Sequence, residues 1–84
     1  MEINRDYLHA NGWKTQNIPI VAFIYPDSFI TQYLNTNEYG YHFVIHDEDG
    51  EWWLQIDDTS HMSCGSLCVQ STDMLEYLFN NYGK

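Results

Sequence analysis

The 84-residue chain contains few basic residues. Twelve Asp and Glu face three Lys and Arg, which gives a formal net charge of -9 at pH 7, and residues 15–83 contain no Lys or Arg at all. Proteins that follow nucleic-acid phosphates or anionic lipids need basic side chains to displace counterions and attract the surface. The charge balance therefore excludes nucleic acids and membrane surfaces as partners. It favours a basic protein, which the negative field would attract.

The chain also lacks a long apolar run. The longest, from Ile18 to Tyr25, spans eight residues and contains Pro19, whereas a membrane-spanning helix needs about 20 apolar residues. The N-terminus shows no basic stretch followed by an apolar one, so we expect no secretory signal. Two cysteines, Cys64 and Cys68, then indicate a cytoplasmic protein with reduced thiols.

Aromatic residues, in contrast, are abundant. Seven Tyr, four Phe and three Trp make up 17% of the residues. Large aromatic side chains bury more area per residue than other side chains do, which helps a chain of this length to build a stable core. We expect one domain spanning residues 1–84, because the chain is too short for a second core.

A short helix is predicted near the N-terminus. The side chain of Asn4 can accept hydrogen bonds from the first helical N–H groups, and Leu8 lies on the apolar side of the helix. Gly12 supplies the left-handed residue that commonly follows a helix end. Trp13 comes directly after it, and we expect this side chain to fold back onto the helix.

A second helix is predicted for residues 71–82. Asp73 and Glu76 stand at the spacing of a capping box. Apolar residues recur every three or four positions and form one stripe that can face a sheet. This stripe consists of Leu75, Leu78, Phe79 and Tyr82.

Two alternating runs, residues 41–46 and 52–57, surround the acidic turn Asp47-Glu48-Asp49-Gly50. Period-2 alternation on both sides of a turn ending in Gly predicts a β-hairpin. Its expected core face carries Tyr41, Phe43, Ile45, Trp52, Leu54 and Ile56. Its other face carries His42, Val44, His46 and Trp53.

The remaining elements are less regular. Residues 18–25 are rich in β-branched and aromatic side chains and predict a buried strand. Residues 27–34 fit a strand or a short helix capped by Asp27, and we favour the helix. Residues 58–65 predict a polar loop, and residues 66–70 a short strand. The expected fold is α+β, with an antiparallel sheet of three to four strands and N- and C-terminal helices packed on one face.

One set of residues has the chemistry of a zinc site. It consists of His61, Cys64 and Cys68, with His46 or Asp58 as the fourth ligand. In an extended strand the two cysteine Cα atoms lie about 13 Å apart, at ~3.3 Å per residue, which is too far for one ion. We therefore expect no metal and no other cofactor, and two packed, reduced cysteines instead.

Other catalytic or ligand motifs are not complete. In a calcium-binding loop with Gly50 at its sixth position, Ile45 and Ile56 would occupy ligand positions, and neither can bind calcium. The chain has no Gly-x-Ser-x-Gly sequence and no Gly-rich phosphate loop. We expect a protein that is not an enzyme. The alternative is a small cysteine- or metal-dependent enzyme that uses His61, Cys64 and Cys68.

The second face of the hairpin is the best candidate for a binding surface. If the sheet is covered on one side only, His42, His46 and Trp53 are exposed beside several acids; if both sides are covered, the histidines are buried. Exposed aromatic residues concentrate binding energy in protein interfaces. The candidate partner-binding residues are Trp53, His42, His46, Asp47, Glu48, Asp49, Glu51, Asp57 and Asp58.

Three short segments carry a resemblance to a group of proteins. They are Tyr7-Leu8-His9-Ala10-Asn11-Gly12-Trp13, the hairpin segment Trp53-Leu54-Gln55-Ile56 and the leucine-rich Leu75-Glu76-Tyr77-Leu78-Phe79. The layout resembles small uncharacterised proteins of phage and mobile-element origin. The resemblance implies an inhibitor of bacterial defence, such as an anti-CRISPR protein, that binds a basic nuclease. The alternative is an immunity protein for a basic nuclease toxin, which would be attracted to its partner by the same negative charge.

Overall fold

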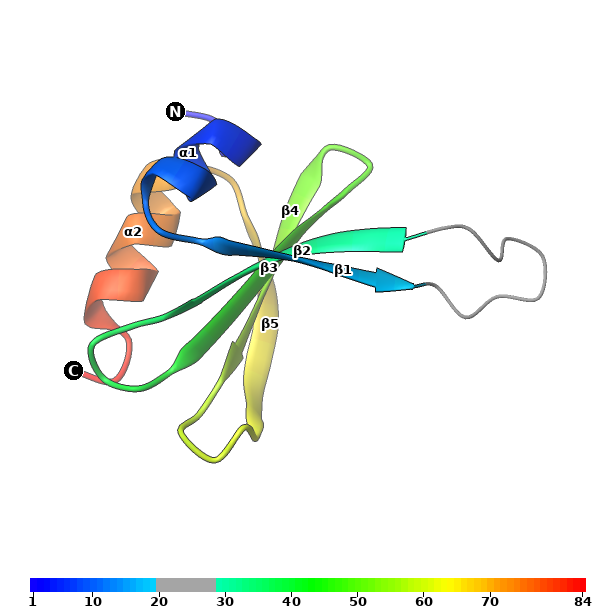
Figure 1. The fold of residues 1–84 in the computed structure, drawn as a ribbon. Coiled ribbons are helices and arrows are strands. Elements are labelled where there is room, and N and C mark those ends of the chain that lie inside the picture. The colour runs from blue at the N-terminus through cyan, green and yellow to red at the C-terminus, as the bar shows by residue number, and fades with distance from the viewer. Residues whose placement is uncertain (20–28) are drawn as a thin grey trace.

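The computed structural model describes residues 1–19 and 29–84, and these form an antiparallel sheet accompanied by two helices (Figure 1). The sheet has five strands, each hydrogen-bonded to its neighbours in the chain, in the order β1-β2-β3-β4-β5. The elements in chain order are α1 (Arg5–Ala10), β1 (Lys14–Pro19), β2 (Phe29–Thr36), β3 (His42–Glu48), β4 (Glu51–Asp57), β5 (Ser63–Val69) and α2 (Thr72–Asn81). The α+β class is confirmed, but the predicted strand number of three to four is too low.

The additional strand is β2, where the helix favoured for residues 27–34 is wrong. Residues 29–36 are extended; residues 29–34 pair with β1 and residues 32–36 with β3. Two ladders satisfy the backbone groups of this segment, which outweighs its weak helical periodicity. Residues 27 and 28 lie outside the described residues. So do residues 20–25 of the strand predicted for residues 18–25, of which β1 contains Ile18 and Pro19.

The predicted hairpin is formed by β3 and β4, and its faces are the predicted ones. Pairing continues through Asp47 with Trp52 and Glu48 with Glu51, so the predicted four-residue turn is reduced to two residues. Phe43 pairs with Ile56 and Ile45 with Leu54, and all four side chains are buried. The two turn residues Asp49 and Gly50 have φ angles of 52° and 84°. Positive φ at both central positions is typical of the tight turn that matches the twist of a hairpin.

The strand predicted for residues 66–70 begins earlier than expected. β5 starts at Ser63, so the predicted polar loop is shorter than residues 58–65. The Asp58 carboxylate closes this loop, since its Oδ1 accepts hydrogen bonds from the backbone N–H groups of Ser60 and Met62 at 2.8 and 2.9 Å. The register between β4 and β5 shifts by one residue where β5 begins: Ile56 pairs with Gly65, but Asp57 pairs with Ser63.

Both helices lie on the same side of the sheet, and the core lies between them and the strands (Figure 1). Trp13 does fold back onto this core, where its ring lies 5.5 Å from the ring of Phe79 and 6.5 Å from that of Phe43. The buried apolar side chains are Ile3, Leu8, Trp13, Tyr33, Phe43, Ile45, Leu54, Ile56, Val69 and Leu75. Neither helix is long and apolar enough to cross a membrane, within the part of the chain that the structure describes.

Each helix begins at a capping side chain. Asn4 Oδ1 accepts a hydrogen bond from the Tyr7 N–H at 2.8 Å, as predicted. The cap of α2 is Ser71, whose Oγ accepts from the Met74 N–H at 3.2 Å. Asp73 is not the cap that the capping-box spacing suggested, because it already lies in the first helical turn. There its negative charge interacts favourably with the helix dipole.

A buried asparagine fastens the end of α2 to the turn between β2 and β3. The Asn37 amide donates hydrogen bonds to the carbonyl oxygens of Phe79 and Tyr82 at 3.1 and 2.8 Å. Its Oδ1 accepts from the N–H groups of Tyr39 and Tyr41, both at 3.0 Å. One side chain thus satisfies two carbonyls at the helix end, where helices leave carbonyls without partners.

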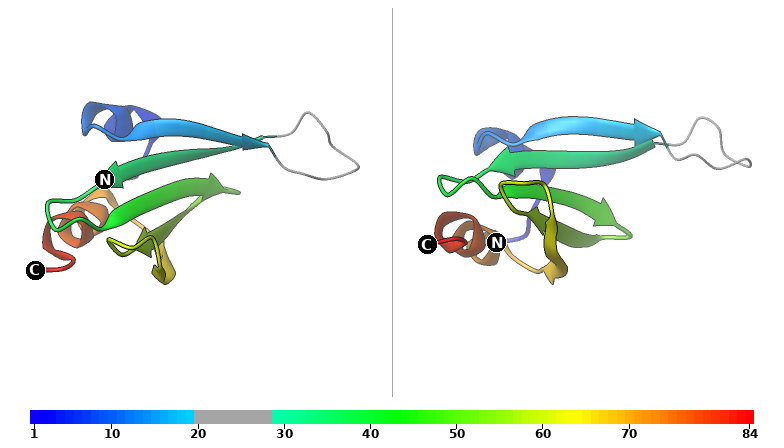
Figure 2. Two further views of the ribbon diagram at one scale, coloured as in Figure 1. Left: turned by 60° about the horizontal axis from the view of Figure 1, so that its bottom comes forward. Right: turned by 90° about the horizontal axis from the view of Figure 1, so that it is seen from below.

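The two ends of the sheet differ in width. β2 pairs with β3 only from Gln32 to Thr36, so its first residues pair with β1 alone. Where β2 has no partner in β3, at residues 29–31, the β1–β2 pair forms an arm that diverges from the β3–β4 hairpin (Figures 1 and 2). This divergence separates the acidic turn at residues 47–50 from the arm.

Candidate protein-binding surface

The strands have a second face, which neither helix covers, and we term it the open face. Alternation along each strand places its side chains opposite the core residues. Cross-strand neighbours align Gln32, His46, Trp53 and Cys68 in one row and Leu34, Val44, Gln55 and Ser66 in the next. The open face also carries Lys14, Gln16, Ile18, Ile30, Thr36, His42, Glu48, Glu51 and Asp57.

The centre of the open face is uncharged and partly apolar. Leu34, Val44 and Trp53 are half-buried by their neighbours on the sheet. Ile18 and Ile30 lie on the arm and are 37% and 40% exposed. Since no described helix or strand packs on these side chains, they form a contiguous surface that a partner can cover.

The turn end of the open face is acidic. Glu48 and Glu51 are directly opposite each other in the hairpin, a pairing of like charges that destabilises a sheet. His46 Nε2 lies 3.6 Å from Glu48 Oε2, and the Glu48 side chain is 68% exposed. A protonated His46 would offset one of these two charges, and the other stays without a partner on the sheet.

At the other end of the open face, two imidazole rings stack. The rings of His42 and His61 lie 4.4 Å apart and 12° from parallel. Thr36 Oγ1 lies 3.1 Å from His42 Nδ1, which fixes the orientation of that ring. Asp57 is the cross-strand partner of His42. His61 has a φ of 64°, so its placement depends on the loop that precedes β5.

The nine predicted binding residues do not all form one surface. Asp47 points to the helix side, Asp49 lies at the tip of the turn, and the Asp58 carboxylate is used inside its own loop. Adjacent acids in a strand alternate between its faces, which the predicted single cluster did not take into account. The six that share the open face are His42, His46, Glu48, Glu51, Trp53 and Asp57.

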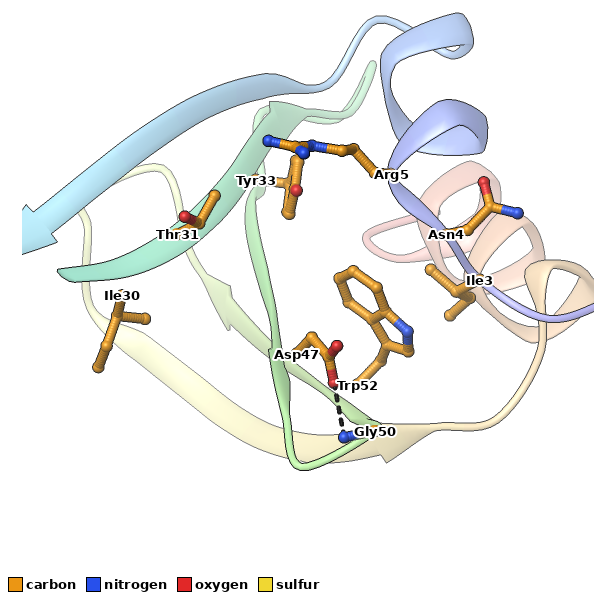
Figure 3. Close-up of a pocket in the computed structure, with 9 residues that line it drawn as sticks. All are labelled: Ile3, Asn4, Arg5, Ile30, Thr31, Tyr33, Asp47, Gly50 and Trp52. Atoms are coloured by element: carbon orange, nitrogen blue, oxygen red, sulfur yellow. Dashed lines mark hydrogen bonds between the residues drawn. The ribbon is translucent and has the colours of Figure 1, made fainter. Parts of the chain in front are cut away.

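Asp47 lines a hollow of about 690 Å³ on the helix side of the sheet (Figure 3). Its oxygen accepts a hydrogen bond from the Gly50 N–H at 3.0 Å and so stabilises the turn. The hollow also contains Arg5 and the aromatic rings of Tyr33 and Trp52, whose centroids lie 5.9 Å apart. Asp47 is therefore a turn residue beside the core and does not belong to the open face.

The acids of this chain are largely uncompensated. The contact between His46 and Glu48 is the one contact within 4 Å between a His, Lys or Arg nitrogen and a carboxylate among residues 1–19 and 29–84, and neither Arg5 nor Lys14 pairs with a carboxylate there. The negative charge at both ends of the open face is thus available to a partner.

Sequence reasoning missed the contribution of β2 and β1 to this surface. Ile30, Gln32 and Leu34 alternate with Phe29, Thr31 and Tyr33, a period-2 signal that was present in the sequence. A helix over residues 27–34, as favoured above, would place Ile30 and Leu34 on one stripe with Phe29 and Tyr33. In the structure both lie on the open face, while Tyr33 is buried on the other side.

The residues of the zinc and cysteine-enzyme alternatives do not form one site. Cys64 and Cys68 are free thiols on the same extended strand, and the His61 ring stacks on His42. Burial, and then the neighbouring Cys64, raises the pKa of the Tyr82 hydroxyl. No three His, Cys, Asp or Glu side chains are grouped to hold a metal in the described part of the chain.

The open face is therefore the candidate site, built from five strands with a half-buried tryptophan near its centre and carboxylates at both ends. No protein-family model, curated protein or solved structure matches this chain.

Proposed function

We propose that the protein is a stoichiometric binding module, without chemistry of its own, that engages a basic protein through the open face. The observation that carries the proposal is the position of Trp53. This side chain lies in an uncovered row of the sheet that contains no acid, between the acidic pair Glu48 and Glu51 at one end and Asp57 at the other.

The apolar centre and charged rim of the open face are features of protein-binding surfaces. Interfaces concentrate their energy in a few central aromatic side chains, with polar groups around them. Trp53, Val44 and Leu34 supply the apolar centre. The carboxylates at the rim select a basic partner and accelerate its approach, since charge complementarity acts mainly on specificity and association rate.

The partner class follows from the charge. A protein with a groove for nucleic acid carries the basic surface that a net charge of -9 attracts. Together with the resemblance to phage and mobile-element proteins, this favours an inhibitor of a bacterial defence nuclease, in the manner of an anti-CRISPR protein. An immunity protein for a nuclease toxin would use the same surface, and an adjacent toxin gene distinguishes that case.

The test is affinity capture from a bacterial lysate with the wild-type protein and two variants. Trp53→Ala removes the central side chain. Tyr77→Ala is the matched control, because Tyr77 is an aromatic residue on α2 that is 69% exposed and away from the open face. A basic partner retained by the wild type and by Tyr77→Ala, and lost with Trp53→Ala, is the expected result.

The captured partner is then titrated calorimetrically at low and high salt. We expect one-to-one binding, a loss of about 2 kcal/mol or more for Trp53→Ala, as for a central interface residue, and weaker binding as salt rises. Binding that does not change with salt would remove the electrostatic part of the proposal. Equal binding by both variants would exclude the open face.

A further inference from the structure

β5 is the last strand of the sheet, and its outer edge has no partner among the described strands. Residues 63–66 are exposed, and Leu67 and Cys68 are half-buried. An edge of this kind presents unpaired N–H and C=O groups, which form a template for another strand. Sheets protect such an edge with Lys, Pro, inward-pointing charges or β-bulges. The one such feature of β5 is the register shift at its start, opposite Ile56 and Asp57.

The two edges of this sheet differ in that protection. β1, at the other edge, begins at Lys14 and ends at Pro19, and both residues hinder the addition of a strand. β5 contains no charged residue and no proline, and residues 59–72 contain no Asp, Glu, Lys or Arg. This uncharged segment is unusual in a chain whose net charge is -9.

We propose that β5 pairs with β5 of a second copy of this chain, antiparallel and about a two-fold axis. Charge favours this occupant, because two copies repel each other wherever acids meet, and β5 brings none into contact. Symmetry favours it too: pairing of β5 with itself closes the assembly at two copies, whereas pairing of β5 with β1 of another copy leaves free edges and produces filaments.

An exposed methionine adds apolar contact to this interface. Met62 directly precedes β5 and is 66% exposed. In an antiparallel pair, the start of one β5 strand lies beside the end of the other, so Met62 of each copy reaches the last residues of its partner's strand. The paired sheets form one ten-stranded sheet, in which the two open faces are continuous.

The experiment is sedimentation analysis and light scattering of the whole chain over a range of concentrations. Ser66→Lys places a charge on the β5 edge. Gln16→Lys is its matched control, since both residues are exposed on the open face of an edge strand and both substitutions add one positive charge. Circular dichroism verifies that each variant is folded.

We expect the wild type and Gln16→Lys to reach twice the chain mass of 10.0 kDa. We expect Ser66→Lys to dimerise at least tenfold more weakly. A wild type that stays at the mass of one chain overturns the proposal. So does a larger series of species, or an equal loss of dimer in both variants.

Hydrogen exchange of the wild type provides a second measurement that needs no variant. Dilution from dimer to monomer should increase amide exchange in residues 63–69 and leave residues 14–19 unchanged. An increase confined to residues 14–19 would assign the pairing to β1 and overturn the proposal. Neither experiment involves a basic partner, so this inference stands or fails separately from the proposed binding function.

Discussion

The two faces of the β3–β4 hairpin share one backbone and differ in almost everything else. Phe43 is fully buried beneath both helices, whereas its neighbour Val44 lies half-buried on a face that no described helix covers. One face carries the tightly packed aromatic core, and the other carries a tryptophan, imidazoles and carboxylates. Alternation along a strand thus places a packed face and an uncovered face on one hairpin, and the proposed function assigns recognition to the second.

Substitution of the two adjacent residues tests this division most strongly. Phe43→Ala should lower the free energy of unfolding by about 3–5 kcal/mol, as expected for a phenylalanine removed from a packed core. Its ring contacts Trp13, Phe79 and Tyr82, all of which lose a partner. Val44→Ala should cost less than about 1 kcal/mol, because its side chain is only half-buried.

Urea denaturation followed by tryptophan fluorescence measures both values. Equal losses for the two variants would contradict the division, since they would mean that the open face is packed as tightly as the core.

Substitution of Asn37 is a second test, and it concerns the covered face, which is the side of the sheet on which the two helices pack. Asn37→Ala removes a buried amide and leaves two helix carbonyls and two N–H groups without their partner. We expect a loss of about 2–3 kcal/mol, because buried polar groups without partners are costly. Asn17→Ala is the control: Asn17 lies on exposed β1 and accepts one hydrogen bond, from Thr31.

Asn17→Ala should change the stability by about 0.5 kcal/mol or less, as is usual for surface positions. Amide exchange in α2 should increase in Asn37→Ala, because the helix end is released. If α2 stays protected and the two variants lose equal stability, Asn37 does not hold the helix on the sheet.

The covered face was more predictable from the sequence than the open one. The hairpin and α2 have long, regular periods, and the Asn4 cap and Gly12 mark the limits of α1 locally. Residues 29–36 fit both the helical period and the strand period. The presence of a neighbouring strand on each side decides between them, and this is not a local property of the sequence. The open face was therefore predicted only where the hairpin builds it, at His42, Val44, His46 and Trp53 and at the acids Glu48, Glu51 and Asp57.

A third prediction concerns the contact between the two helices that cover the core. The Tyr7 hydroxyl donates a hydrogen bond to Glu76 Oε1 at 2.8 Å. Burial, and then this carboxylate, raises the pKa of Tyr7 above its ordinary value of 10.0. The folded protein therefore holds this proton more tightly than the unfolded chain does.

The stabilisation by Tyr7 is fully present below pH 10, and it decreases as the pH rises further, because the unfolded chain then releases the proton first. Tyr7→Phe should cost about 1 kcal/mol near neutral pH, the usual value for one hydrogen bond. Its stability should also fall less steeply with pH above 10 than that of the wild type. Thermal unfolding across this range measures the two slopes, and identical slopes would contradict the assignment to Tyr7.

The smallest effect is expected at the acidic pair on the open face. Glu51→Lys replaces the repulsion between Glu48 and Glu51 with an attraction between cross-strand neighbours, and we expect a gain of about 0.2–1 kcal/mol in stability. Glu51→Gln only removes the repulsion and should gain less. Both gains should shrink at high salt, because these side chains are exposed.

The same substitution should weaken binding to a basic partner, since it places a positive charge on the rim of the open face. A variant that is more stable and binds less well would indicate that these acids are retained for recognition at a cost in stability. A loss of stability in Glu51→Lys would contradict this, because it would mean that Glu51 already has a favourable electrostatic role in the folded hairpin. The sign of this small change therefore decides whether the charge of the open face serves the fold or the partner.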